Sequence, residues 1–99
     1  MNYRLSKKAE VDLQGIWLYT NKNWSLEQAD VYVRMLLDEM ERLAANPGSG
    51  RDRSDLRKNY KCSQVKSHLI FYQTISRQKE IEIIRILHKQ MDIENRLGD

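Results

Sequence analysis

The 99-residue sequence has few of the residues that interrupt or cross-link a chain. Its single cysteine, Cys62, cannot form an internal disulfide, which suits the reducing cytoplasm. One proline and four glycines, beside 40% hydrophobic residues, exclude a disordered chain. Apolar runs stay far below the roughly 20 residues of a membrane-spanning helix, and residues 1–8 do not resemble a signal peptide. We therefore expect one cytoplasmic domain over residues 1–99, with no membrane partner.

The sequence also lacks the short motifs of common enzyme classes. It contains no Walker loop, no G-x-G-x-x-G, no G-x-S-x-G and no H-E-x-x-H. The conceivable metal ligands are Cys62, His68, His88 and Asp92, whose spacing matches no metal signature. Cys62 is interpreted as a small buried hydrophobic residue. We expect no metal, no cofactor and no catalytic residue.

Basic charge is concentrated in one short window. Residues 1–50 carry six Lys/Arg and seven Asp/Glu, whereas residues 51–66 carry six basic and two acidic side chains. The basic residues of this window are Arg51, Arg53, Arg57, Lys58, Lys61 and Lys66. Such an excess can attract an acidic partner or a phosphate backbone, although a solvated loop and strand surface also explains it.

The segment 46–50, Asn-Pro-Gly-Ser-Gly, divides a helical half from a strand-like half. Ser6 is a good N-cap for a first helix, and Ser25 with Gln28 forms a capping-box pattern for a second. The apolar positions are Ala9, Leu13, Ile16, Trp17 and Trp24 in the first helix, and Leu26, Ala29, Val33, Leu36, Leu37, Met40, Leu43 and Ala44 in the second. The short junction predicts an antiparallel hairpin, and Pro47 ends the second helix near residues 45–46.

After the loop the apolar period changes to two. Residues 60–66, 68–76 and 80–87 are predicted strands, residues 3–5 form a short extended run, and a turn at 77–79 pairs the last two strands antiparallel. Residues 69–72 and 81–87 are apolar on both faces, which is typical of central strands covered on both sides. Residues 91–97 form a short helical turn or an ordered tail. The predicted fold class is α+β, an N-terminal antiparallel helical hairpin packed on a small antiparallel β-sheet.

The two helices carry a second set of apolar residues opposite their core stripes. These are Val11, Gly15 and Leu18 in the first helix and Val31 and Met35 in the second. Scattered exposed apolar residues are common and need no special explanation. The alternative interpretation is a face that receives an amphipathic partner helix.

Metal-free RNA cleavage is the enzyme hypothesis that has residues to support it. The candidate phosphate-binding residues are Arg57, Lys58, Lys61 and Arg85, and the candidate proton carriers are His88 and Tyr60. Arg85 and His88 would face opposite sides of a continuing strand, which weakens the hypothesis. A hydrogen-bonded structural role also explains a histidine near a strand end.

Many segments, in order and at matching spacing, resemble ParE toxins of the RelE/ParE superfamily. They are Leu5-Ser6, residues 9–13 and 16–20, Trp24, residues 28–30, Tyr32, residues 43–47, Gly50-Arg51, residues 68–72, residues 85–88 and Met91-Asp92. The strongest are the 68–72 stretch, H-L-I-F-Y, and the 85–88 stretch, R-I-L-H. Ser25 and Ser67 stand where family members often have glycine, which are mild changes at a cap and a turn.

The resemblance implies the toxin component of a type II toxin–antitoxin module, with a helical hairpin on an antiparallel sheet. It implies DNA gyrase as the target and a ParD-like, ribbon-helix-helix antitoxin as the neutralising partner, which forms a hetero-oligomer with the toxin and alone contacts operator DNA. It also implies that the ribonuclease residues of RelE are lacking.

Under this hypothesis the basic window and the 85–92 segment engage the target. The predicted target-binding residues are Arg51, Arg53, Arg57, Lys58, Lys61, Arg85, His88, Met91 and Asp92, and the predicted antitoxin-binding residues are Val11, Gly15, Leu18, Val31 and Met35. Two alternatives remain open: a RelE-type ribosome-dependent mRNA endoribonuclease, and an inactive remnant that only completes an operator-binding complex.

Overall fold

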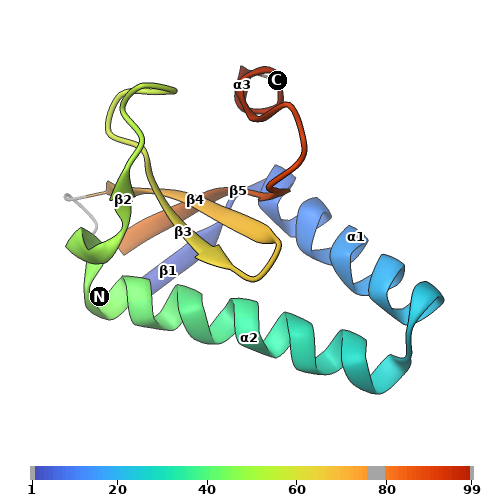
Figure 1. Ribbon diagram of the computed structural model, residues 1–99. Coiled ribbons are helices and arrows are strands. Elements are labelled where there is room, and N and C mark those ends of the chain that lie inside the picture. The colour runs from blue at the N-terminus through green and yellow to red at the C-terminus, as the bar shows by residue number, and fades with distance from the viewer. Residues whose placement is uncertain (1, 76–79, 99) are drawn as a thin grey trace.

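The computed structural model describes residues 2–75 and 80–98, which form three layers (Figure 1). The elements are β1 (Asn2–Leu5), α1 (Lys7–Asn23), α2 (Leu26–Ala45), the 3₁₀ turn η1 (Pro47–Ser49), β2 (Arg51–Asp52), β3 (Lys61–Val65), β4 (His68–Ile75), β5 (Glu80–His88) and α3 (Ile93–Gly98). The helices α1 and α2 cover one face of the sheet, called here the hairpin face. The opposite face, called here the α3 face, is covered by α3 and the loop at 53–60.

The predicted helical hairpin is confirmed, and its ends lie where the capping residues place them. The Ser6 hydroxyl accepts the Ala9 N–H at 3.0 Å, and the Ser25 hydroxyl accepts the Gln28 N–H at 3.0 Å. Each cap satisfies a backbone donor that has no partner inside its helix. The helix α2 ends at Ala45 because a proline at 47 cannot continue it.

The sheet is mixed, which corrects the predicted antiparallel arrangement. Its order is β1-β5-β4-β3-β2, and β1 pairs parallel to β5 while the other neighbours are antiparallel. The extended run at the N-terminus enters the sheet because its inward side chains, Tyr3 and Leu5, pack against the core beneath the hairpin. At the end of β1, the Ser6 N–H donates to the Ile83 carbonyl at 2.9 Å, which fixes the strand beside β5.

The three predicted long strands are confirmed with small shifts at their ends, as is the antiparallel pairing of β4 with β5. The turn predicted at 77–79 lies outside the described residues. The two-residue strand β2 was not predicted, because it is too short to show a periodic pattern. The β4–β5 ladder shifts register between Phe71 and Tyr72, which pair with Arg85 and Ile83, so Ile84 forms a β-bulge.

Both faces of the central strands are buried, as their two-sided apolar pattern predicts. The core on the hairpin face contains Ala9, Ile16, Leu36, Met40, Leu43, Ala44, Ile70, Tyr72, Ile81, Ile83 and Ile86. The core on the α3 face contains Cys62, Phe71, Leu87 and Leu97, so the C-terminal segment is a docked helix. None of the described helices is long and apolar enough to cross a membrane.

Two residues of the predicted core stripes are exposed. Trp24 is 70% exposed and Leu26 is 55% exposed, although both were assigned to buried positions. They lie at the tip of the hairpin, which projects beyond the sheet (Figure 1). The apolar stripes therefore continue past the part of the sheet that covers them.

Candidate functional site

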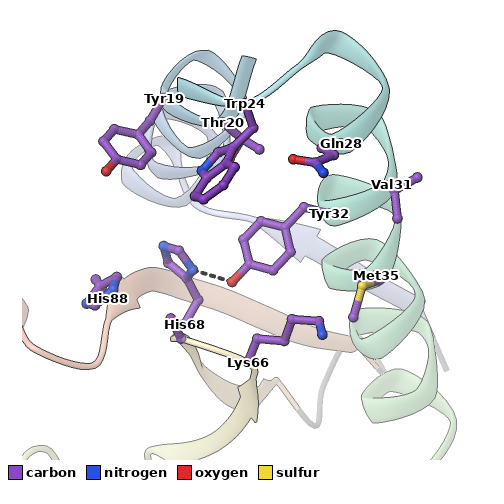
Figure 2. Close-up of a pocket in the computed structure, with 11 residues that line it drawn as sticks. Tyr19, Thr20, Trp24, Gln28, Val31, Tyr32, Met35, Lys66, His68 and His88 are labelled. Atoms are coloured by element: carbon purple, nitrogen blue, oxygen red, sulfur yellow. Dashed lines mark hydrogen bonds between the residues drawn. The ribbon is translucent and has the colours of Figure 1, made fainter. Parts of the chain in front are cut away.

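An apolar groove lies where the projecting half of the hairpin passes over the end of the sheet. It consists of two adjoining hollows of about 500 and 570 Å³, and both are lined by Tyr19, Thr20, His68 and His88. Figure 2 shows the first hollow, with α1 at the top, α2 along the right side and the strand ends below. We refer to the two hollows together as the groove.

The walls of the groove are largely apolar. The first hollow is also lined by Trp24, Gln28, Val31, Tyr32, Met35, Lys66 and Ser67, and the second by Val11, Asp12, Gly15, Ile16, Ile86, Gln90 and Met91. Exposed apolar side chains gathered around one hollow are typical of a surface that binds a partner.

The floor of the groove is a cluster of three rings. The His68 ring stands between those of Tyr32 and His88, with ring centroids 5.4 and 5.3 Å away (Figure 2). The Tyr32 hydroxyl lies 2.5 Å from His68 Nδ1 and can also donate to the Val65 carbonyl at 3.3 Å. His88 Nδ1 accepts the Gln90 N–H at 3.1 Å.

The environment of the cluster disfavours charge on it. Burial lowers the pKa of His68, the nearby His88 lowers it further, and Asp12 opposes the shift. Burial likewise raises the pKa of the Tyr32 hydroxyl, so this side chain stays protonated near neutral pH. The environment therefore favours the neutral forms of His68 and Tyr32 in the free protein.

The bulge at Ile84 places His88 on the floor of the groove. Residues of a regular strand alternate between faces, yet Ile83 and Ile86 both pack in the core on the hairpin face. The extra residue between them shifts the alternation of side chains by one position in the rest of β5. As a result, His88 lies on the same face as Ile86, whereas Arg85 and Leu87 lie on the α3 face. The expectation that Arg85 and His88 face opposite sides is confirmed.

The structure gathers most of the predicted antitoxin-binding residues around the groove. Val31 and Met35 line one hollow, and Val11 and Gly15 line the other. Leu18 is 61% exposed but is not among the residues that line either hollow.

The predicted target-binding residues do not form a single site. His88 and Met91 line the groove. Arg51 and Lys61 belong to the paired strands β2 and β3, and Arg57 and Lys58 are exposed in the loop that joins them. Arg53 is paired with Asp55 at 3.1 Å.

The last two predicted target-binding residues have structural partners. Arg85 donates to Asp12 of α1 at 2.8 and 3.0 Å and to the Arg96 carbonyl at 2.9 Å. Asp92 accepts the Asn95 side-chain amide at 2.6 Å before the start of α3. These contacts assign Arg85 to joining α1, β5 and α3, and Asp92 to the start of α3.

Of the candidate metal ligands, the structure brings His68 and His88 together but leaves Cys62 on the other face of the sheet. Cys62 is buried on the α3 face, where burial raises the pKa of its thiol, whereas His68 and His88 face the hairpin. Over residues 2–75 and 80–98, no three His, Cys, Asp or Glu side chains are placed to hold a metal ion.

Sequence reasoning missed the contribution of Tyr32, His68 and Lys66 to the groove. Tyr32 was noted as part of a family pattern, and His68 as part of that pattern and as a conceivable metal ligand. The predicted antiparallel pairing of the last two long strands could have revealed the His68–His88 contact. In the observed register His68 is paired with His88, which brings the two rings together.

Comparisons with known proteins agree on one family. The family described as "ParE toxin of type II toxin-antitoxin system, parDE" matches residues 3–93. The chain is 41% identical to Toxin ParE1 of Caulobacter vibrioides over 96 residues, which cover 97% of each chain. It is 36% identical to Toxin ParE1 of Mycobacterium tuberculosis, with 96% of each covered, and 33% identical to Toxin ParE of Escherichia coli, with 98% of this chain and 93% of the relative covered.

A solved structure has the same fold. The chain aligns with one from the "Chromosomal ParDE TA system from P. aeruginosa" with a TM-score of 0.76, covering 89% of this chain and 95% of that chain. At 20% sequence identity this likeness establishes the shared fold alone.

Proposed function

The chain belongs to the ParE toxin family of type II toxin–antitoxin systems, and on that premise we propose that it inhibits DNA gyrase by binding and thereby blocks replication. The observation that carries the proposal is the family match across residues 3–93. The toxin acts in the cytoplasm and performs no chemistry of its own.

A ParD-like antitoxin neutralises the toxin by occupying the groove. Support comes from the exposed apolar side chains that surround it, Val11, Val31 and Trp24 among them. Covering them would remove apolar surface from water, which favours association by roughly 25 cal/mol for each Å² buried. The antitoxin also contacts operator DNA, so the toxin reaches DNA only through its partner.

The basic surface around β2 and the following loop contacts the target. Arg57 and Lys58 are exposed there, and Arg51 of β2 pairs with Cys62 of β3, whose side chain lies on the α3 face. This surface is on the opposite side of the sheet from the groove. The separation gives target and antitoxin different contact residues, which allows the two activities to be tested independently.

The alternative, a RelE-type ribonuclease, has less support. It needs Arg85 and His88 beside one scissile phosphate, together with cations such as Arg57. Arg85 lies on the α3 face and is bound to Asp12, whereas His88 lines the groove on the hairpin face. The geometry therefore favours binding over RNA cleavage.

Pulse-labelling of DNA and protein synthesis, in the minutes after inducing the toxin alone, tests the proposal. Gyrase inhibition predicts that DNA synthesis stops first while translation continues. Early arrest of translation would contradict the proposal and direct attention to RNA cleavage. Continued growth, with antitoxin binding retained, would identify an inactive remnant.

A further inference from the structure

The groove has a polar floor but little fixed charge. Two of its lining residues are charged, Asp12 and Lys66. The Asp12 carboxylate is already used, because it accepts two bonds from Arg85 and one from the Ile86 N–H at 2.9 Å. The polar side chains that can still interact with a ligand are Lys66 and the imidazoles of His68 and His88. The groove is therefore complementary to a negatively charged group.

We propose that the groove takes an apolar segment of the antitoxin that carries one carboxylate side chain, and that His68 gains a proton when this carboxylate binds beside it. The inference rests on the proposed function in taking the antitoxin as the occupant. It adds the chemistry of recognition, namely an ion pair that forms only in the complex.

Tyr32 allows His68 to accept the proton without losing a hydrogen bond. In the neutral form the Tyr32 hydroxyl can donate to His68 Nδ1, which lies 2.5 Å away. In the protonated form Nδ1–H donates to the Tyr32 oxygen, and the hydroxyl turns to the Val65 carbonyl at 3.3 Å. The second ring nitrogen lies on the side away from Tyr32 (Figure 2), where it can donate to the partner's carboxylate.

The hydrogen bonds of His88 differ from those of His68. Its Nδ1 already accepts the Gln90 N–H, so a proton there would bring two donors face to face. Its remaining nitrogen, Nε2, carries the proton of the neutral ring. Protonation at His88 therefore costs a hydrogen bond, whereas protonation at His68 does not.

The other groups around His68 fix the direction of the effect. The titratable and charged groups that line the groove with it are Asp12 and Tyr19 of α1, Tyr32 of α2, Lys66 of the β3–β4 turn and His88 of β5. Burial and His88 lower the pKa of His68 in the free protein. A bound carboxylate raises it, so the complex holds more protons than its separated parts and binding tightens as the pH falls.

The test is isothermal titration calorimetry of the intact toxin with the purified full-length ParD-like antitoxin. It is run at about pH 7.5 and about pH 5.5, which bracket the ordinary histidine pKa, in buffers of different protonation enthalpy. We expect net uptake approaching one proton, and affinity that rises by about tenfold per pH unit in the middle of this window. Proton resonances of the His68 ring, followed by NMR, should show a higher pKa in the complex than in the free toxin.

The matched variants are His68→Gln and His88→Gln. The first should remove most of the proton uptake and flatten the pH dependence, while the second should retain the uptake. Replacing the antitoxin's carboxylates one at a time by amides should identify one whose loss has the same effect as His68→Gln.

Three results would overturn the inference: no proton uptake by the wild-type pair, an unchanged His68 pKa in the complex, or equal weakening by His68→Gln at both pH values. An antitoxin that does not bind at all would overturn both the inference and the antitoxin part of the proposed function. Gyrase inhibition is assayed without antitoxin, so its failure is recognised separately.

Discussion

Arg85 of β5 and Asp12 of α1, which are 73 residues apart in the sequence, form a bidentate ion pair with N–O distances of 2.8 and 3.0 Å. Their side chains are only 11% and 13% exposed. The same carboxylate accepts the Ile86 N–H, beyond the point where β1 stops pairing with β5. Asp12 therefore completes the open edge of β5, and the pair fixes α1 against the strand that carries His88.

Replacing Asp12 by Ala should lower the free energy of unfolding by about 3 kcal/mol, since a largely buried guanidinium and a backbone N–H each lose a partner. Chemical denaturation measures this loss. The control is Arg4→Ala, which removes the more exposed Arg4–Glu82 contact of 4.0 Å and should cost less than about 1 kcal/mol. Equal losses in the two variants would contradict the assigned role of Asp12.

Gly50 is required by the close approach of Tyr72. The Tyr72 hydroxyl accepts the Gly50 N–H at 3.0 Å and donates to the Pro47 carbonyl at 2.7 Å, and a Cβ at position 50 would collide with it. We predict that Gly50→Ala lowers the free energy of unfolding by about 1–3 kcal/mol, by overpacking.

The matched control for that change is Gly48→Ala, because a Cβ there would meet nothing within 4 Å. Thermal unfolding of both variants makes the comparison. A loss of stability confined to Gly48→Ala, or shared equally, would show that the contact with Tyr72 is not the cause.

The free toxin should lose stability as the solution becomes acidic. The folded-state pKa of His68 lies below its unfolded value, so the unfolded chain binds the proton more readily. The stabilising contribution is present above the unfolded pKa of about 6.5 and is lost as the pH falls through the lower folded value. Urea unfolding between about pH 7.5 and about pH 5 should show this slope in the wild type and a reduced slope in His68→Gln. Identical slopes would rule out His68 as the responsible group.

Antitoxin binding should depend on the groove and not on apolar exposure in general. Val31 and Leu18 are both 61% exposed, but only Val31 lines the groove. We expect Val31→Asp to weaken antitoxin binding by tenfold or more, that is by about 1.4 kcal/mol, and Leu18→Asp to change it little. Calorimetric titration of both variants decides the point, and the opposite order would place the antitoxin on the outer side of α1.

Reversing charge at Arg57 and Lys58 to Glu should abolish toxicity and leave antitoxin binding intact. Both side chains are exposed on the loop before β3, on the far side of the sheet from the groove. The control is the same reversal at Lys7 and Lys8, two exposed residues in the first turn of α1. Growth after induction measures toxicity, and full toxicity of the Arg57/Lys58 variant would remove the basic surface from the target site.

The sequence predicted those parts of the fold that depend on local chemistry. Ser6, Ser25 and Pro47 fix the ends of the helices through their own side chains, and the two-sided apolar pattern of residues 69–72 identifies a central strand. The parallel pairing of β1 could not be predicted, since it depends on where a four-residue strand finds an open edge. The exposure of Trp24 depends on how far the sheet extends beneath the hairpin. The apolar periodicity of the helix does not indicate that length.

The groove was predicted in part. Val11 and Val31 were identified because they lie opposite the core stripes of their helices. The direction of His88 could not be predicted, because it depends on a single bulged residue, Ile84, that reverses the facing of the rest of β5. The assignment of Arg85 to target binding remains a prediction, although its bonds to Asp12 provide a structural role.

Gyrase inhibition without catalysis is tested by adding the purified toxin to purified gyrase and relaxed plasmid DNA. We expect loss of supercoiling and accumulation of cleaved DNA held by gyrase, with relief when the antitoxin is added first. The Arg57/Lys58 charge reversal should be inactive while still folded. Normal supercoiling in excess toxin, together with cleavage of messenger RNA on ribosomes, would show that the toxin is a ribonuclease and does not inhibit gyrase.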